Sequence, residues 1–411
     1  MMAFDVLVLG GGFAGVWSAA GAMRVRRQAG AANAEVRVTL VDAGDDMVIR
    51  PRLYEAAPEQ MRVPLDRVLG PIGVRRIAAT VTGIDTTAHL VTAVDRAGAP
   101  LTVSYDRLVL ATGSRVIRPR IAGAEHLFEV DTLPHAAVLD AHLRRLPGLP
   151  PAAGRYTAVV IGAGFTGLEL ATELVGRLRA IAGSPAEPHV ILIERAGVVG
   201  PELGEGPRPL IAGALTELGV EVRLGVTVDG VTQHGVRLSD GSQIAACTTV
   251  WTAGMKASRL TSCIPGKRDR LGRLQVDEYL RVAGVPDVYA AGDTAAALAE
   301  ENHPVMQSCQ HAVPQGKFAG HNVAAELLGL PMARFEPDPY VTCLDLGGAG
   351  AVLTSGWDRT VVQTGPQAKE LKRNINAVWI YPPVDNAGKI LDWADHRTTW
   401  PTEETVAAAS T

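Results

Sequence analysis

Residues 4–15 read Phe4-Asp5-Val6-Leu7-Val8-Leu9-Gly10-Gly11-Gly12-Phe13-Ala14-Gly15, an apolar run that enters a G-x-G-x-x-G turn. The same arrangement returns as Thr157-Ala158-Val159-Val160-Ile161-Gly162-Ala163-Gly164-Phe165-Thr166-Gly167. A helix-forming stretch follows each turn. An aliphatic run bounded by glycine is typical of a buried strand, so each copy predicts a strand, a tight turn and a helix.

An acidic residue closes the next apolar strand of each copy. Asp42 follows Val38-Thr39-Leu40-Val41, and Glu194 follows Val190-Ile191-Leu192-Ile193. Each acid lies 32 positions after the first glycine of its loop, which is longer than the usual spacing of about 20 residues. Small and polar stretches at residues 28–34 and 182–188 account for the extra length.

These residue types suit the binding of a dinucleotide. The first glycine makes the tight turn, the second lets the backbone approach a pyrophosphate, and the third lets helix and strand pack closely. The N–H groups and the positive dipole at a helix N-terminus favour phosphate, while the acid can accept hydrogen bonds from a ribose. Two such units predict two dinucleotide sites, and two bound redox cofactors imply electron transfer between them.

Composition sets the broad class. The chain has 411 residues, of which 47% are hydrophobic, and this length suggests two or three domains with sizeable cores. A net charge of −4 argues against nucleic acid as the main partner. The four cysteines show no C-x-x-C and no metal-ligand spacing, so no metal site is predicted and a reduced cytosolic setting is the simplest interpretation. No run of about 18 apolar residues predicts a membrane span, and the N-terminal run lacks the features of a signal peptide.

Each copy continues with β-rich sequence. Residues 79–110 alternate and turn at Arg96-Ala97-Gly98, residues 220–250 alternate and turn at Asp240-Gly241, and prolines in residues 146–154 mark a linker before the second copy. From about Tyr340 the composition changes to Gly-rich strands, followed by a segment that carries Trp and Tyr. The sequence therefore predicts an α/β protein with two Rossmann-like dinucleotide-binding domains, each with a β-meander, and a smaller C-terminal α+β region.

Three further turns follow in order: Ala111-Thr112-Gly113, Trp251-Thr252-Ala253-Gly254 and Ala291-Gly292-Asp293. With the two glycine loops they resemble the two-dinucleotide-binding flavoproteins of the glutathione-reductase-like fold, over about residues 4–330. The resemblance implies that the first repeat binds FAD and the second binds NAD(P)H. It implies a discontinuous FAD domain at 1–118 and 266–335, a nucleotide domain at 119–265 and a C-terminal domain at 336–411.

The same resemblance implies site residues. Those for FAD are Gly10, Gly12, Phe13, Ala14, Gly15, Asp42, Arg50, Ala111, Thr112, Gly113, Gly292 and Asp293. Those for the nicotinamide nucleotide are Gly162, Gly164, Phe165, Thr166, Gly167, Glu194 and Gly254. A carboxylate at Glu194 favours NADH, whereas Arg195 beside it leaves NADPH open. Asp293 has an alternative role as the cap of a helix from Thr294 onward.

Finer matches resemble the type II NADH:quinone oxidoreductases. Residues 309–316 resemble their A-Q-x-A-x-Q-Q-G quinone motif, with Cys309 and Pro314 as the departures; Pro314 is expected to shift or start the helix. Residues 51–55 resemble P-L-L-Y-E, and residues 167–171 resemble G-V-E-L-A. The resemblance places Glu169 near flavin and nicotinamide, assigns Gln310 and Gln315 to the quinone, and assigns a lysine near it to Lys369 or Lys372, with Lys372 favoured.

These residues have simpler interpretations as well. Glu169 could be a first-turn helix acid that interacts favourably with the helix dipole. Either glutamine could lie on a helix surface or act as a cap. The aromatic run at residues 375–383 could cover the flavin, form a subunit interface, touch lipid or be a core strand that ends at Pro382. His303 and His311 could each supply a proton or be structural.

Three functions follow. No cysteine pair lies near the expected flavin, so direct transfer from NADH through FAD to a quinone is the first hypothesis. The segment after Pro401 is neither basic nor strongly amphipathic, unlike a membrane-surface helix, and this favours the second, a soluble reductase for a metabolite or a partner protein. The third is an NADH-dependent redox-sensing binding protein. We expect a cytoplasmic location, with peripheral contact at the inner face of a membrane and a homodimer both left open.

Overall fold

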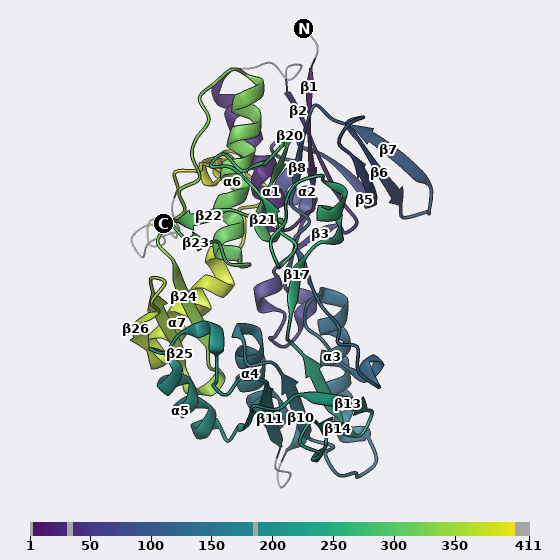
Figure 1. The fold of residues 1–411 in the computed structure, drawn as a ribbon, viewed down its shortest axis with the longest axis vertical. Coiled ribbons are helices and arrows are strands. Elements are labelled where there is room, and N and C mark those ends of the chain that lie inside the picture. Colours follow the sequence, from purple (N-terminus) through teal and green to yellow (C-terminus); the bar gives the residue numbers. More distant parts are fainter. Residues whose placement is uncertain (1–2, 31–35, 184–187, 399–411) are drawn as a thin grey trace.

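The computed structural model describes residues 3–30, 36–183 and 188–398, so the segment after Pro401 lies outside the described residues. The chain forms two lobes stacked along its long axis, with a third, C-terminal unit against their side (Figure 1). The upper lobe holds the first glycine loop, and the lower lobe holds the second.

The upper lobe is built on a sheet of eight strands in the order β19-β20-β8-β1-β2-β5-β6-β7. Its centre is parallel, while β5, β6 and β7 form an antiparallel meander and β19 pairs antiparallel with β20. The strands are β1 (Phe4–Leu9), β2 (Val36–Asp42), β5 (Arg75–Asp85), β6 (Leu90–Asp95), β7 (Pro100–Ser104), β8 (Arg107–Leu110), β19 (Arg281–Val282) and β20 (Val285–Ala290). Strands β19 and β20, from late in the chain, thus join β1, β2 and β8 in one sheet, as a discontinuous domain requires. The predicted domain limits themselves stay a prediction.

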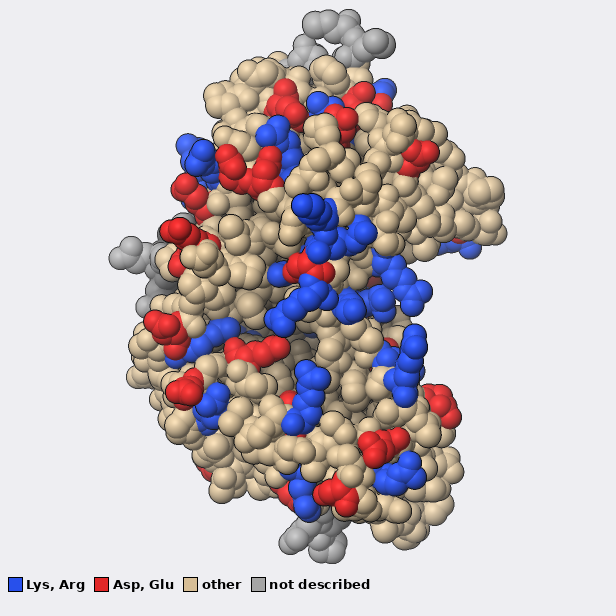
Figure 2. Space-filling model, in the orientation of Figure 1, with Lys and Arg blue, Asp and Glu red and all other residues tan. Residues whose placement is uncertain are grey.

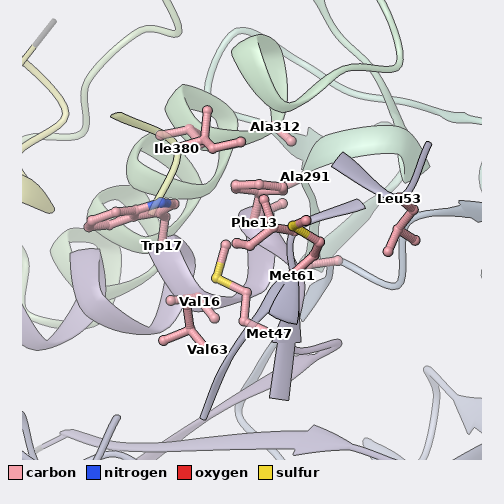
Figure 3. Packing of buried hydrophobic residues seen from close by; sticks show 14 of the residues in the cluster. Phe13, Val16, Trp17, Met47, Leu53, Met61, Val63, Ala291, Ala312 and Ile380 are labelled. Carbon is pink, nitrogen blue, oxygen red and sulfur yellow. The ribbon is translucent and has the colours of Figure 1, made fainter. Parts of the chain in front are cut away.

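Helix α1 (Phe13–Gln28) packs along α6 (Cys309–Leu327) above this sheet. Glycines set the close distance between them: a Cβ on Gly316 would lie 2.4 Å from the Ala14 carbonyl oxygen, and one on Gly320 would lie 2.1 Å from that of Ser18. Figure 3 shows Phe13 of α1 beside Ala291 and Ala312, in the core under the first loop. The sequence prediction that Pro314 shifts or starts the helix is wrong in that α6 begins at Cys309 and Pro314 lies inside it.

The lower lobe repeats the plan on a smaller scale. Its parallel sheet has the order β12-β11-β10-β16, and an antiparallel meander β13-β14-β15 lies beside it. The elements are α3 (Leu133–Arg145), β10 (Thr157–Ile161), α4 (Phe165–Ala182), β11 (His189–Glu194), α5 (Arg208–Leu218), β12 (Glu221–Leu224), β13 (Val228–Thr232), β14 (Gly235–Leu238), β15 (Gln243–Ala245) and β16 (Thr248–Trp251). The predicted α/β class with two Rossmann-like units is confirmed.

A two-stranded ribbon joins the lobes at the waist. Strand β9 (Ser114–Val116) enters the lower lobe and β17 (Met255–Ala257) leaves it, paired antiparallel (Figure 1). The upper lobe also contains short elements: β3 (Asp46–Val48), β4 (Arg62–Pro64), α2 (Leu65–Leu69), β18 (Leu274–Gln275), β21 (Ala295–Ala296), β22 (Leu298–Glu300) and β23 (His303–Pro304).

The C-terminal unit is a three-stranded antiparallel sheet covered by helices. It comprises β24 (Val341–Asp345), β25 (Ala351–Ser355), β26 (Thr360–Thr364), α7 (Gly365–Asn374) and a π-helical turn (Ile375–Trp379). The last helix, α8 (Ala387–Trp393), packs against α1 of the upper lobe. The core-strand interpretation of residues 375–383 is therefore wrong. Tertiary contacts override the β propensity of that run, because the buried Asn376 side chain donates to Glu55 at 3.0 Å and to the Tyr54 hydroxyl at 3.3 Å.

Within the described ranges, no helix combines the length and apolar character needed to cross a bilayer.

Gly320→Val tests the close packing of α1 on α6. The added side chain meets backbone rather than a flexible side chain, so we expect a loss of about 1–3 kcal/mol in unfolding free energy, read from urea denaturation. Gly176→Ala is the control, because that exposed helical glycine has open space around it and should gain about 0.5–1 kcal/mol. An unchanged midpoint for Gly320→Val would contradict the packing argument.

Candidate functional site

A single cleft of about 2950 Å³ runs between the lobes and along the C-terminal unit. Both glycine loops line it. Single-ligand pockets usually measure about 300–1,000 Å³. The cleft therefore has room for more than one ligand in contact with another.

The two loops have the same local geometry. Gly10 and Gly162 both have φ +108°, which favours glycine, and their N–H groups donate to Val41 (2.9 Å) and Ile193 (2.8 Å) respectively. A Cβ on the third glycine of either loop would lie 1.8 Å from the carbonyl oxygen of the first. Gly15 and Gly167 therefore pack helix on strand and do not line the cleft, whereas the other predicted loop residues do.

The acid of each repeat supports its own loop. Asp42 accepts hydrogen bonds from the Gly11 and Gly44 N–H groups, both at 2.7 Å, and Glu194 accepts from those of Ala163 and Ala196, both at 2.8 Å. A carboxylate has about four acceptor positions. Both acids line the cleft, so each retains acceptor positions for a ribose.

The second glycines carry the test of whether a dinucleotide fits. Gly12 and Gly164 have ordinary φ values of −81° and −74°, and a Cβ at either would meet no atom within 4 Å. Nothing in the described protein requires glycine at these positions. A phosphate that approaches the backbone at the N-termini of α1 and α4 does require it.

Asp293 is held in the wall of the cleft by side chains from distant parts of the chain. Its carboxylate accepts from Ser114 Oγ at 2.6 Å and lies 3.5 Å from Arg50, which also pairs with Asp131. Burial raises the pKa of Asp293, against the opposing effects of Arg50 and Ser114. The carboxylate caps no helix in the described structure, because Gly292–Thr294 is a single short turn without a side-chain cap.

Glu169 and Lys372 form a buried ion pair inside the cleft. Glu169 comes from α4 and Lys372 from α7; they are 4% and 6% exposed, and Nζ lies 2.8 Å from Oε1. Burial raises the pKa of Glu169 to about 7 although Lys372 opposes the shift. Burial alone would lower the pKa of Lys372, but the charge of Glu169 raises it on balance. This carboxyl can therefore exchange a proton near neutral pH.

Contacts with Asp345, Tyr54 and Lys369 hold this pair in place, and sequence reasoning missed most of them. The Asp345 N–H donates to Glu169 at 3.1 Å, and its carboxylate accepts from the Tyr54 hydroxyl at 3.1 Å and pairs with Lys369. Tyr54 belongs to the 51–55 motif, which was the only sequence signal for the network. Asp345 carries no recognisable sequence signal, because a lone acidic residue at the end of a strand is common.

The glutamines occupy two different environments. Gln310 lines the cleft, and its amide lies against the backbone of Val341, where one orientation gives N···O 2.5 Å and O···N 3.1 Å. Gln315 is fully buried, accepts from the Gly292 N–H at 3.1 Å and does not line the cleft among the described residues. The expectation of a direct acceptor contact is corrected for Gln315: it positions the turn that carries Asp293.

The predicted proton donors His303 and His311 and the four cysteines do not supply reactive groups to the cleft. Neither His303 nor His311 lines the cleft among the described residues, and burial lowers the pKa of His311 to about 4, so that it is neutral at pH 7. All four cysteines are free. Burial raises the pKa values of Cys309 and Cys343, the two that line the cleft, to about 11. Both remain protonated thiols, which disfavours a thiol relay.

Only part of the segment at residues 375–383 lines the cleft. Ile375 and Trp379 line it, whereas Val378 is 54% exposed on the surface. A π-helical turn is frequently found at a functional site.

These features together define a two-dinucleotide oxidoreductase. Residues 4–316 match the family described as pyridine nucleotide-disulphide oxidoreductase, and the chain belongs to that family. It is an NAD(P)H-dependent flavoprotein oxidoreductase that uses FAD and NADH.

Particular relatives narrow the comparison. The chain is 48% identical to an NADH dehydrogenase-like protein of Mycobacterium tuberculosis, over 93% of this chain and 95% of that one. It is 30% identical to a type II NADH:quinone oxidoreductase of the same organism, over 88% and 80%. In fold it is similar to NDH2 from Plasmodium falciparum in complex with NADH, with TM-score 0.75, 12% identity and 95% and 96% coverage.

Substitution of the two second glycines should separate the two nucleotide sites. We expect Gly12→Ala to lower the FAD content of the purified protein, and Gly164→Ala to raise the dissociation constant of NADH about tenfold or more with normal FAD content. Flavin absorbance per chain and NADH titration measure the two effects. Each variant is the control for the other, and retention of both ligands by both variants would contradict the phosphate assignment.

Proposed function

We propose that this protein is an NADH:quinone oxidoreductase that passes two electrons from NADH through FAD to a quinone. The observation that carries the proposal is the Glu169–Lys372 pair, which lines the same cleft as both glycine loops. Reduction of a quinone to a quinol consumes two protons. A carboxyl whose pKa lies near 7 at the meeting point of three structural units is suited to supply one of them.

The FAD-binding residues that we propose lie in the upper lobe. The first loop would hold the pyrophosphate at the N-terminus of α1, Asp42 would bind the ribose, and Asp293 with Arg50 would face the ribityl chain. Thr112 and Gly113 line the cleft between them, and the Thr112 hydroxyl is buried without a hydrogen-bond partner in the described structure. FAD, when bound, takes a hydride from the nicotinamide and releases its electrons to the acceptor.

The nucleotide-binding residues that we propose lie in the lower lobe. The second loop would hold the phosphates of NADH at the N-terminus of α4, and Gly254 would lie along the nucleotide. Glu194 is 7% exposed and fixed by two backbone N–H groups, so it cannot swing away from a 2′-phosphate. We therefore propose that NADH is preferred over NADPH.

Lys372 and Glu169 act at the acceptor end of the cleft. With Glu169 ionised, the Lys372 ammonium compensates its charge, which a buried carboxylate requires. With Glu169 protonated, its carboxyl can donate a proton to an acceptor oxygen. The names of the relatives support a quinone as that acceptor, and Gln310 is the one of the two predicted glutamines that lines the cleft and could contact it.

Anaerobic stopped-flow tests this function directly. The flavin is reduced with NADH or with NADPH and then mixed with a water-soluble ubiquinone analogue. We expect faster bleaching with NADH and reoxidation by the quinone well above the buffer control. Reoxidation no faster than in buffer would rule out the quinone.

Glu169→Gln tests the proton donor. The protonated carboxyl is the donor, so wild-type quinone turnover should fall as pH rises through about 7. The amide should lower kcat about 100-fold or more and remove this pH dependence. Arg373→Met is the matched control, because it removes a positive charge from the exposed face of the same helix and should leave turnover and its pH dependence unchanged. An unchanged pH profile in Glu169→Gln would exclude Glu169 as the donor.

A further inference from the structure

The waist of the molecule carries a concentration of positive charge in a chain of net charge −4. Figure 2 shows Lys and Arg side chains gathered between the two lobes, at the level of β17 in Figure 1. We define the waist surface as the eight basic residues on and next to the β9–β17 ribbon: Arg115, Arg118, Arg120, Lys256, Arg259, Lys267, Arg268 and Arg270. All but the half-buried Arg115 are exposed to solvent.

The ribbon places like charges directly opposite each other. Arg115 of β9 is the register partner of Lys256 on β17. Like charges in opposed positions of an antiparallel pair destabilise it. A two-stranded ribbon has little other pairing to offset this cost, so the arrangement indicates an anionic partner.

Acidic residues do not neutralise the waist surface. Residues 114–120 contain no acid, and residues 255–275 contain only Asp269, which pairs with Arg273 at 2.7 Å. Arg118 lies 3.4 Å from Glu129, and Arg268 donates to the Thr261 and Ile264 carbonyls. The described residues provide no ion pair for Arg120, Lys256, Arg259, Lys267 or Arg270.

The bound dinucleotides do not account for this charge. Their phosphates have the two glycine loops, and only Lys256 and Arg270 of the waist surface line the cleft. Arg120, Arg259 and Lys267 lie outside it. The charge therefore extends beyond the cleft, along a surface that a macromolecule would cover.

The shape favours a protein over a bilayer. The meander β5-β6-β7 projects on one side of the waist and the lower lobe on the other, and the outline of the molecule narrows between them (Figures 1 and 2). A flat membrane would meet the two projections first, whereas a small convex protein can enter the notch.

We propose that the waist surface docks a small acidic protein that accepts electrons from the flavin, beyond the quinone reaction. One NADH would reduce two one-electron carriers, giving NAD⁺, one H⁺ and two reduced carriers. The step needs only NADH and FAD, so it is independent of the quinone assignment. Charge complementarity would steer the carrier to the rim of the cleft, where Met255 next to Lys256 contacts Arg50.

Binding to two haem proteins of opposite charge tests the docking. We expect the FAD-loaded protein to bind acidic cytochrome b5 but not basic cytochrome c at about 20 mM ionic strength, and to release it at about 500 mM, where screening is strong. Arg120→Glu/Arg259→Glu/Lys267→Glu should weaken binding at least about tenfold, since three attractive charges become repulsive. The matched control is Arg27→Glu/Arg75→Glu/Lys389→Glu, three exposed basic residues on other elements, which should bind normally.

The rate of electron transfer to cytochrome b5 is a second measurement that tests the proposal. NADH-driven reduction of cytochrome b5 should fall in the first triple variant, while flavin bleaching by NADH and quinone reduction stay at wild-type rates. Equal binding of both haem proteins, or unchanged reduction of cytochrome b5 in that variant, would overturn the proposal. Binding to phosphatidylglycerol vesicles without binding to cytochrome b5 would assign the surface to lipid instead. Slower flavin bleaching would assign it to the coenzyme.

Discussion

The contact between the third glycine and the first glycine of each loop is the constraint on which the site depends. Gly15 lies over the carbonyl of Gly10, and Gly167 lies over that of Gly162, with no space for a side chain. Each helix can therefore begin directly at the end of its strand, with its N-terminal N–H groups at the edge of the parallel sheet. Since both sheets present that edge to the same cleft, two phosphate-binding helix ends face one shared space.

The C-terminal unit adds what the repeats alone lack. It supplies Lys372 to a carboxylate that belongs to the lower lobe, and Trp379 to the wall of the cleft. A buried Glu169 without that lysine would be an isolated carboxylate at high cost in free energy. Packing of the C-terminal unit on α4 is thus tied to the electrostatics of the cleft.

The β9–β17 ribbon at the waist both connects the lobes and contacts cleft residues of the upper lobe. Asp293 and Arg50 of the upper lobe contact Ser114, Met255 and Asp131 at the ribbon and its continuation, so the connection between lobes is also part of the cleft wall. In the cleft, Asp131 pairs with Arg50 and Glu169 pairs with Lys372. Outside it, Arg120, Arg259 and Lys267 of the waist surface have no ion pair with any residue that the structure describes. That difference separates the interior, where ligands are held, from a surface suited to an acidic partner.

Sequence alone determined the elements that local rules govern. The strand–glycine–helix repeats, the acids after the second strands, the two meanders and the α/β class all follow from periodicity and from turns that only glycine allows. Tertiary structure decided the rest. It made residues 375–379 π-helical, left α6 continuous through Pro314, buried Gln315 under the Gly292 turn and brought Lys372 rather than Lys369 to Glu169. These outcomes depend on contacts between residues far apart in the chain, whose burial and pairing energies no local pattern records.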